Sequence, residues 1–211
     1  MKTLVQCDFD GTITEEDVSF LLLDIFAQGD WRQVLRDYKE HKISVSNFNT
    51  QVFAMIKADR LTLLKAIEGK VRFRSGFKDL VAYCSRRDFR LVIASNGLAF
   101  YIRALLKEFG LEKVEIYAAD TKFHIDGLKV QYIGPDGNQM DNGLKEAYIK
   151  SFLEQGYRVI YVGDGDSDIH PAKNAHQILA RDELLSYCMN NNLKCKSFDD
   201  IHDVIRALEF L

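Results

Sequence analysis

Cysteine and proline are scarce in this chain, whose 211 residues include four cysteines and two prolines. No two of the cysteines stand at the two-residue gap that zinc and redox sites commonly use. This spacing argues against a cysteine-based metal centre and against a disulfide framework. We expect free thiols, with Cys7 and Cys84 as small buried residues, because unpaired cysteine is among the most buried residue types.

The chain also lacks a strong charge of either sign, with a formal net charge of −3. No stripe of Lys and Arg with interleaved aromatic residues is present, so we expect no nucleic-acid partner. The apolar start, Met1–Asp10, is broken by Asp8 and is too short for a signal peptide. Apolar residues make up 47% and charged residues 28%, the balance of a globular protein that does not span a membrane. We expect a cytoplasmic protein.

The pattern of apolar residues divides the chain into two kinds of segment. Residues 3–7 form a short apolar run that ends at Asp8 and is typical of a buried strand. Residues 16–72 carry successive amphipathic helical patterns with little strand signal. Strands and helices alternate after Gly76, which predicts an α/β fold with a doubly wound parallel sheet. We therefore expect a core of residues 1–15 and 73–211, and a separate helical unit of residues 16–72.

Acidic, hydroxyl and basic groups follow the predicted strands or open the predicted helices at four places along the chain. These are Asp8-Phe9-Asp10-Gly11-Thr12, Ser95-Asn96-Gly97, Lys145, and the run from Gly163 to Asp168. Each alone is compatible with ordinary turn chemistry, because Asp, Gly and Ser are common in loops. Four in succession indicate a site, since ligands of doubly wound sheets bind beyond the carboxyl ends of the strands.

In this order the motifs resemble those of the haloacid dehalogenase superfamily, over nearly the whole chain. The helical segment 16–72 is similar in position to the small cap that the phosphoserine-phosphatase-like branch carries after its first strand. The resemblance implies a phosphatase with a Rossmann-like core, which acts on a small phosphomonoester through an aspartyl-phosphate intermediate and requires Mg²⁺. The second aspartate, Asp10, favours a phosphatase over a dehalogenase, because a halide leaving group needs no acid.

The resemblance also implies a role for each motif residue. Asp8 is the expected nucleophile, Asp10 the general acid and base, and Lys145 a fixed positive charge at the phosphoryl group. Mg²⁺ is expected on Asp8, on the backbone carbonyl of Asp10 and on Asp164, with Asp168 positioning Lys145 or a metal-bound water. Gly11 is expected to permit a tight turn. Phosphate or substrate binding is assigned to Ser95, Asn96, Gly97, Thr12 and Asp17, and Thr12 is also expected to orient Asp10.

For the substrate, Asp17 is informative because phosphoserine phosphatases usually carry a Glu at this position to meet the substrate ammonium. Asp17, Arg74-Ser-Gly-Phe77 and Ala180-Arg-Asp-Glu-Leu184 resemble more closely the methionine-salvage phosphatases, which act on 2-hydroxy-3-keto-5-methylthiopentenyl 1-phosphate. The segment before Lys145 can be cysteine-rich in that family and contains no cysteine here.

Several residues and activities stay open at this point. Arg72, Arg74 and His170 are candidates for substrate contact or for structural roles, and Phe20, Phe48 and Phe53 are interpreted as packing within the helical segment. Phosphoserine hydrolysis, and transfer of phosphate to a second substrate as in a mutase, are alternatives within the superfamily. A phospho-acceptor signalling domain is the alternative without enzymatic activity, although such domains place the phosphorylated Asp after a later strand.

Overall fold

A single mixed sheet forms the centre of the computed structural model, which describes residues 2–210. Its strands lie in the order β5-β4-β3-β2-β1-β6-β7-β8. Six neighbouring strands are parallel, namely β3, β2, β1, β6, β7 and β8. The strands β4 and β5 extend the sheet beyond β3 in antiparallel pairing. The strands are β1 (Thr3–Cys7), β2 (Arg90–Leu98), β3 (Glu115–Lys122), β4 (Lys129–Ile133), β5 (Gln139–Met140), β6 (Arg158–Gly163), β7 (Gln177–Ala180) and β8 (Cys195–Ser197).

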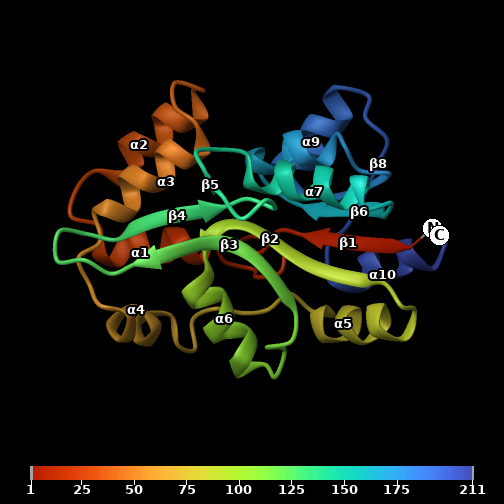
Figure 1. The fold of residues 1–211 in the computed structure, drawn as a ribbon, viewed down its shortest axis with the longest axis horizontal. Helices are drawn as coiled ribbons and strands as arrows, with labels where there is room; N and C mark the ends of the chain where they lie inside the picture. The colour runs from red at the N-terminus through yellow and green to blue at the C-terminus, as the bar shows by residue number, and fades with distance from the viewer. Residues whose placement is uncertain (1, 211) are drawn as a thin grey trace.

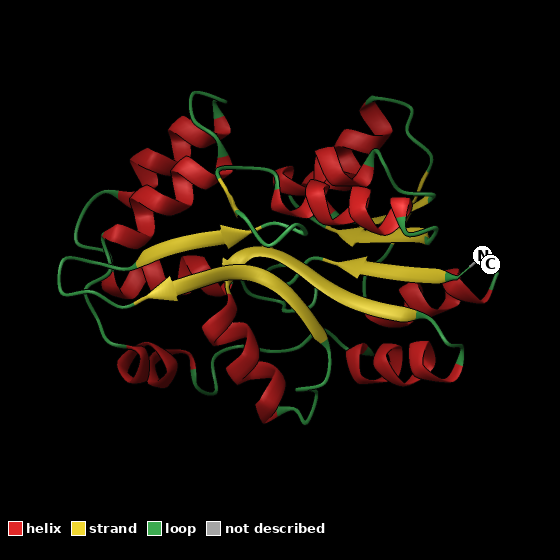
Figure 2. Ribbon diagram, viewed as in Figure 1, coloured by secondary structure: helices red, strands yellow, loops and turns green. Residues whose placement is uncertain are grey.

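Helices cover both faces of this sheet (Figures 1 and 2). The helices that follow residue 76 are α5 (Phe77–Arg86), α6 (Ala99–Glu108), α7 (Leu144–Glu154), α8 (Ile169–Ala172), α9 (Asp182–Asn190) and α10 (Ile201–Glu209). All five residues of β1 are buried, as expected for a central strand with helices on both sides. The predicted α/β fold with a doubly wound, mainly parallel sheet is confirmed.

Four helices lie between β1 and α5. They are α1 (Val18–Phe26), α2 (Trp31–Lys39), α3 (Val45–Ala54) and α4 (Arg60–Ile67). Side chains of Asp17, Asp30, Ser44 and Asp59 accept a hydrogen bond from the first turn of these helices, so each helix begins at a short polar residue. Figure 1 shows them at the same end of the molecule as the β3–β4 hairpin. The division into a core and a separate unit of residues 16–72 stays a prediction.

The strand β2 is longer than its apolar run indicates. The pattern predicts a strand over residues 90–94, whereas β2 continues to Leu98. Its pairing with β3 shifts in register between Ala94 and Leu98, and Ser95, Asn96 and Gly97 lie within this irregularity. Bulges of this kind redirect side chains next to functional sites. The short strands β5 and β8 were not predicted, because two or three residues cannot show an alternating pattern.

Candidate active site

The loop after β1 starts the site at the carboxyl edge of the sheet. The backbone N–H of Asp8 donates to the carbonyl of Val162 on the neighbouring β6, at 2.9 Å, which continues the β1–β6 pairing up to Asp8. Gly11 then turns the chain with a φ of +79°. A Cβ at Gly11 would stand 2.5 Å from Asp164 Oδ2, so both the turn and the close approach of the two loops require glycine.

Lys145, in the first turn of α7, connects the loops after β1 and β6. Its Nζ lies 2.9 Å from Asp8 Oδ2, 2.7 Å from Asp168 Oδ1 and 3.0 Å from Ser167 Oγ, so all three ammonium hydrogens have acceptors. The side chain is only 3% exposed. Gln6 of β1 fixes the same helical turn by donating from Nε2 to the Lys145 carbonyl at 3.0 Å. A buried ammonium held in this way is a fixed positive charge beside Asp8.

Asp168 uses both carboxylate oxygens within the protein. Besides Lys145, Oδ1 accepts from the Tyr161 hydroxyl at 2.6 Å, and Oδ2 accepts from the backbone N–H groups of Asp164 and Gly165 at 3.0 Å. The residue is fully buried. Asp168 therefore holds Lys145 in place and fixes the loop after β6, and its role in catalysis stays a prediction.

Asp164 and Thr12 join the loops after β6 and β1. The Thr12 hydroxyl donates to Asp164 Oδ1 at 2.6 Å and leaves Asp164 Oδ2 close to Gly11. The sequence-based assignment of Thr12 to phosphate binding and to the orientation of Asp10 is not what the geometry shows. Thr12 is fully buried, is not among the residues that line the cavity, and orients Asp164 instead.

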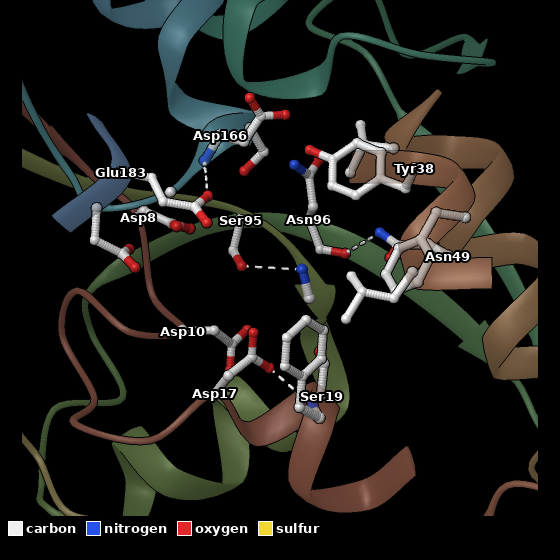
Figure 3. A pocket seen from close by; sticks show the side chains of 18 of the residues that line it. Asp8, Asp10, Asp17, Ser19, Tyr38, Asn49, Ser95, Asn96, Asp166 and Glu183 are labelled. Atoms are coloured by element: carbon white, nitrogen blue, oxygen red, sulfur yellow. Dashed lines mark hydrogen bonds between the residues drawn. The ribbon is translucent and has the colours of Figure 1, made fainter. Parts of the chain in front are cut away.

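Asp10 is held by two donors that the sequence did not single out. Its Oδ1 accepts from the backbone N–H of Val18 at 3.0 Å, and its Oδ2 accepts from the Tyr101 hydroxyl at 2.6 Å. Val18 begins α1 and Tyr101 lies in α6, so the orientation of this carboxyl depends on helices from two parts of the chain. Asp17 lies beside Asp10 in the lining of the cavity (Figure 3).

Ser95, Asn96 and Gly97 line the cavity in the irregular part of β2, and their role in phosphate binding stays a prediction. Ser95 Oγ accepts from the Gly97 N–H at 3.0 Å, which fixes the turn of this segment. The Asn96 carbonyl accepts from Asn49 Nδ2 at 3.0 Å and from the Tyr132 hydroxyl at 2.8 Å. Asn49 belongs to α3, so the helical segment is hydrogen-bonded directly to the segment that contains Ser95 (Figure 3).

Asp17 lines the cavity but also caps α1. Its Oδ1 accepts from the backbone N–H of Phe20 at 2.8 Å, so this carboxylate has a structural role beside any contact with substrate. Burial raises the pKa of Asp17 to about 6. The negative charge of Asp17 contributes in turn to the raised pKa of Asp10.

The cavity, of about 340 Å³, is lined by two chemically different sets of residues. One set is polar and comes from the strand ends and the first turn of α7, among them Asp8, Ser95 and Lys145. The other set forms an apolar wall within the helical segment, which also contributes the polar residues Asp17, Ser19, Lys39 and Asn49; the apolar wall consists of Phe20, Leu23, Leu35, Tyr38, Val45, Phe48 and Phe53. The interpretation of Phe20, Phe48 and Phe53 as packing residues alone is therefore wrong. They pack within the helices and also form the apolar wall.

Arg72, Arg74 and His170 lie outside the cavity lining. Arg72 is exposed and pairs with Glu15 and Glu16. Arg74 donates to the carbonyls of Gly11 and Thr12 at 2.8 and 2.9 Å and thereby supports the loop after β1. His170 lines a neighbouring cleft, between α7, α8 and the turn that joins α2 to α3.

Negative charge exceeds positive charge among the buried site residues. Burial and the charge of Asp168 raise the pKa of Asp8 well above its ordinary value, although Lys145 opposes the shift. The same two causes raise the pKa of Asp164 to about 7. Burial alone would lower the pKa of Lys145, but the carboxylates of Asp168 and Asp8 outweigh burial and raise it. A second positive charge is thus needed before these carboxylates can ionise together.

Mg²⁺ fits this donor set. Oxygens of Asp8, Asp164 and Asp168 lie within 4.8 Å of one another, and carboxylate oxygens are the ligands that Mg²⁺ prefers. Asp168 already accepts four hydrogen bonds, so Asp8 and Asp164 are the carboxylates best able to hold the ion. Thr12 would hold Asp164 in place for this purpose.

Tyr101, Asn49 and Ser19 are among the site residues that the sequence analysis did not name. Tyr101 is fully buried, and a buried tyrosine hydroxyl usually requires a partner, which is a signal that could have marked it. Asn49 is a polar residue on the buried face of a helix and carries a similar signal. No pattern in the sequence indicates which groups these side chains contact.

Comparison with known proteins agrees with this geometry. The family model of haloacid dehalogenase-like hydrolases matches residues 5–173, and the chain belongs to this family. The predicted family and its class of phosphatases are confirmed. Relatives named 2-hydroxy-3-keto-5-methylthiopentenyl-1-phosphate phosphatase share 28% identity in Bacillus pumilus and 29% in Brevibacillus brevis. The alignment with the Bacillus pumilus protein covers 96% of this chain and 89% of the relative. The alignment with the Brevibacillus brevis protein covers 99% of this chain and 96% of the relative.

Solved structures of phosphoserine phosphatases have a similar fold. A substrate-bound complex superposes with a TM-score of 0.72 at 16% identity and covers 98% of both chains. The phosphoserine phosphatase from T. onnurineus also gives a TM-score of 0.72, at 18% identity, over 100% of this chain and 96% of the other. At these identities the likeness establishes the fold. Among residues 2–210, no helix has the length and apolarity needed to cross a membrane.

Proposed function

We propose that the protein hydrolyses a small phosphomonoester with an apolar tail, through an aspartyl phosphate on Asp8. The observation that carries the reaction type is the position of Asp8, 2.9 Å from a buried ammonium and open to a cavity that it shares with Asp10 and Asp164. In this proposal Asp8 attacks the phosphorus atom. Ser95 holds a phosphoryl oxygen, and the fixed positive charge of Lys145 neutralises part of the negative charge that would otherwise repel the nucleophile.

Asp10 protonates the departing alcohol oxygen in the same step, and later takes a proton from the water that hydrolyses the aspartyl phosphate. Burial and the nearby charge of Asp17 raise the pKa of Asp10 to about 8, which keeps this acid protonated near neutral pH. Asp8, the Asp10 carbonyl and Asp164 are the groups that would hold Mg²⁺, and the ion would supply positive charge to the phosphoryl group during its transfer. Residues 16–72 act as a cap that excludes water and contacts the substrate beyond its phosphate.

The apolar wall of the cavity supports a particular substrate class. Phosphoserine carries an ammonium and a carboxylate, which need charged partners. The helical segment lines the cavity with two charged residues, Asp17 and Lys39, but with seven aliphatic or aromatic ones, which favours a substrate whose tail is mainly apolar. The relatives in Bacillus pumilus and Brevibacillus brevis are named for a substrate with a methylthio end. We propose 2-hydroxy-3-keto-5-methylthiopentenyl 1-phosphate, or a close chemical relative, as the substrate. We also propose that the enzyme acts in the cytoplasm.

A comparison of specificity constants tests the substrate class. Values of kcat/KM would be measured with Mg²⁺ for a series of alkyl 1-phosphates of increasing chain length, for O-phosphoserine and for the methylthio substrate. Because each buried methylene contributes about 0.8 kcal/mol, kcat/KM should rise roughly threefold to fourfold with each carbon that reaches the wall. A preference for O-phosphoserine over every alkyl phosphate would refute the proposed substrate. Phosphate that passes to an added alcohol without appearing free would instead favour a phosphotransferase.

A further inference from the structure

The hydroxyl of Tyr101 lies between Asp10 and Ser19 in a defined hydrogen-bonding order. It donates to Asp10 Oδ2 at 2.6 Å and lies 2.8 Å from Ser19 Oγ. A phenol carries one hydrogen, and that hydrogen is given to Asp10, so Ser19 must donate to the Tyr101 oxygen. The chain therefore runs from Ser19 through Tyr101 to Asp10, and each bond polarises the next.

Packing leaves the Tyr101 hydroxyl and the Asp10 carboxyl little freedom to move. Tyr101 is fully buried and its ring contacts those of Phe9 and Phe100, with centroids 6.4 and 5.6 Å away. A Cβ at Gly97 would collide with both the Tyr101 hydroxyl and Asp10 Oδ2, so only glycine permits this approach. The Val18 N–H holds the other carboxylate oxygen.

We propose that Tyr101 is a positioning residue for the acid step, which aims the Asp10 carboxyl at the leaving oxygen of the substrate. This inference rests on the proposed function. Asp10, Ser19 and Gly97 line the cavity, whereas Tyr101 does not, so Tyr101 acts on the reaction through Asp10. The proton transferred as the P–O bond breaks is that of Asp10, and the phenolic hydrogen stays on Tyr101.

Orientation of Asp10 by Tyr101 affects some substrates more than others, whereas a purely structural role of Tyr101 would affect all substrates equally. If the Asp10 carboxyl is wrongly oriented, hydrolysis slows more for alkyl phosphates, whose leaving group must be protonated, than for substrates with a stable phenolate leaving group. The specificity constant kcat/KM includes the steps up to the loss of the alcohol. The dependence of kcat/KM on the pKa of the leaving group therefore measures how effectively Asp10 protonates the leaving oxygen.

The test compares Tyr101→Phe with the unchanged enzyme over a series of alkyl and aryl phosphates. General acid catalysis increases reaction rates about 100-fold to 10,000-fold. A partial loss of the correct orientation of Asp10 should therefore lower kcat/KM about 10-fold to 100-fold for alkyl phosphates. For 4-nitrophenyl phosphate the loss should stay within about threefold. Ser19→Ala, which removes one bond of the chain, should steepen the leaving-group dependence less. Equal losses for all substrates, or no loss, would overturn the proposal.

Two further variants separate this inference from the proposed function. Tyr83→Phe makes the same chemical change at a buried tyrosine whose hydroxyl has no partner among residues 2–210, and it should leave the leaving-group dependence unchanged. Asp10→Asn should steepen that dependence most, and adding Tyr101→Phe to it should have no further effect. If Asp10→Asn fails to steepen it, the role of Asp10 in the proposed function is wrong. If Asp10→Asn steepens it and Tyr101→Phe does not, the inference about Tyr101 alone is wrong.

Discussion

Thr12 Oγ1 donates to Asp164 Oδ1 at 2.6 Å, across 152 positions of sequence. The bond joins the loop that carries the candidate nucleophile to the loop that carries a candidate metal ligand. It directs one carboxylate oxygen of Asp164 to Thr12, while the other approaches Gly11. The geometry of the candidate metal site thus depends on a residue that is itself buried away from the cavity.

Thr12→Val should weaken the binding of Mg²⁺ without removing any metal ligand. Loss of a residue that orients a ligand typically reduces metal affinity about 10-fold to 100-fold, so the Mg²⁺ concentration at half-maximal activity should rise by that factor. The control is Thr121→Val, because the Thr121 hydroxyl is buried without a partner in the described chain. An equal Mg²⁺ requirement in Thr12→Val and the unchanged enzyme would contradict the role given to Thr12.

Lys145→Met should destabilise the metal-free protein as well as abolish its activity. The substitution leaves the carboxylates of Asp8 and Asp168 buried without their positive partner, at a cost of about 3–5 kcal/mol in the free energy of unfolding. Urea unfolding in the presence of a chelator measures this change.

The double variant Lys145→Met with Asp168→Asn provides the control, because it removes one of the two buried carboxylates that lose their positive partner. It should recover part of the free energy of unfolding that Lys145→Met loses. A loss below about 1 kcal/mol for Lys145→Met would indicate a solvated lysine and contradict the buried ion pairs.

Metal-free protein should lose stability as the pH rises. Burial raises the pKa of Asp164 to about 7 and that of Asp8 well above its ordinary value. Between about pH 4, where an unfolded aspartate titrates, and about pH 7, the folded state therefore binds more protons than the unfolded state. The free energy of unfolding must fall as the pH increases through this window.

Thermal unfolding with a chelator, and again with Mg²⁺, measures the effect. The melting temperature should fall from about pH 5 to about pH 8 without metal, and the fall should shrink when Mg²⁺ is present. Asp164→Asn should flatten the metal-free dependence because one of the raised acids is gone. A metal-free protein that becomes more stable over this range would contradict the charge balance described for the site.

Leu35→Asn should impair the use of substrates with an apolar tail. Leu35 of α2 is partly buried and lines the apolar wall, so a polar side chain there opposes burial of the tail. We expect the preference for long over short alkyl phosphates, measured as a ratio of kcat/KM values, to fall about 10-fold. Val34→Asn in the same helix is the matched control, since Val34 packs against the core but does not line the cavity. An unchanged ratio in Leu35→Asn would place the tail elsewhere.

Much of the fold and the polar end of the site could be predicted from the sequence. Strand ends of a parallel sheet lie along one edge, so Asp8, Ser95 and Asp164 had to come near one another once their strands were assigned. Lys145 follows from the same argument, because it lies in the first turn of α7, which packs against β2 and β6. The assignment of roles to these residues remains a proposal that the predictions above test.

The other end of the site could not be predicted in this way. Phe48 and Asn49 are neighbours on α3, and the first lines the apolar wall while the second bonds to Asn96. Their contacts depend on how the helical segment packs against the sheet, which periodicity within one helix does not determine. Thr12 shows the same limit at shorter range, since its sequence neighbour Asp10 was the expected partner and the distant Asp164 is the actual one.

The most direct measurement of the central claim is the location of the covalent phosphate. Enzyme mixed with Mg²⁺ and an excess of a phosphomonoester would be quenched in acid within a single turnover, and its peptides would be analysed by mass spectrometry. We predict a phosphoryl group on Asp8, and its absence in Asp8→Asn, which should also lose Mg²⁺-dependent hydrolysis. Phosphate on another residue, or substantial hydrolysis by Asp8→Asn, would contradict the account.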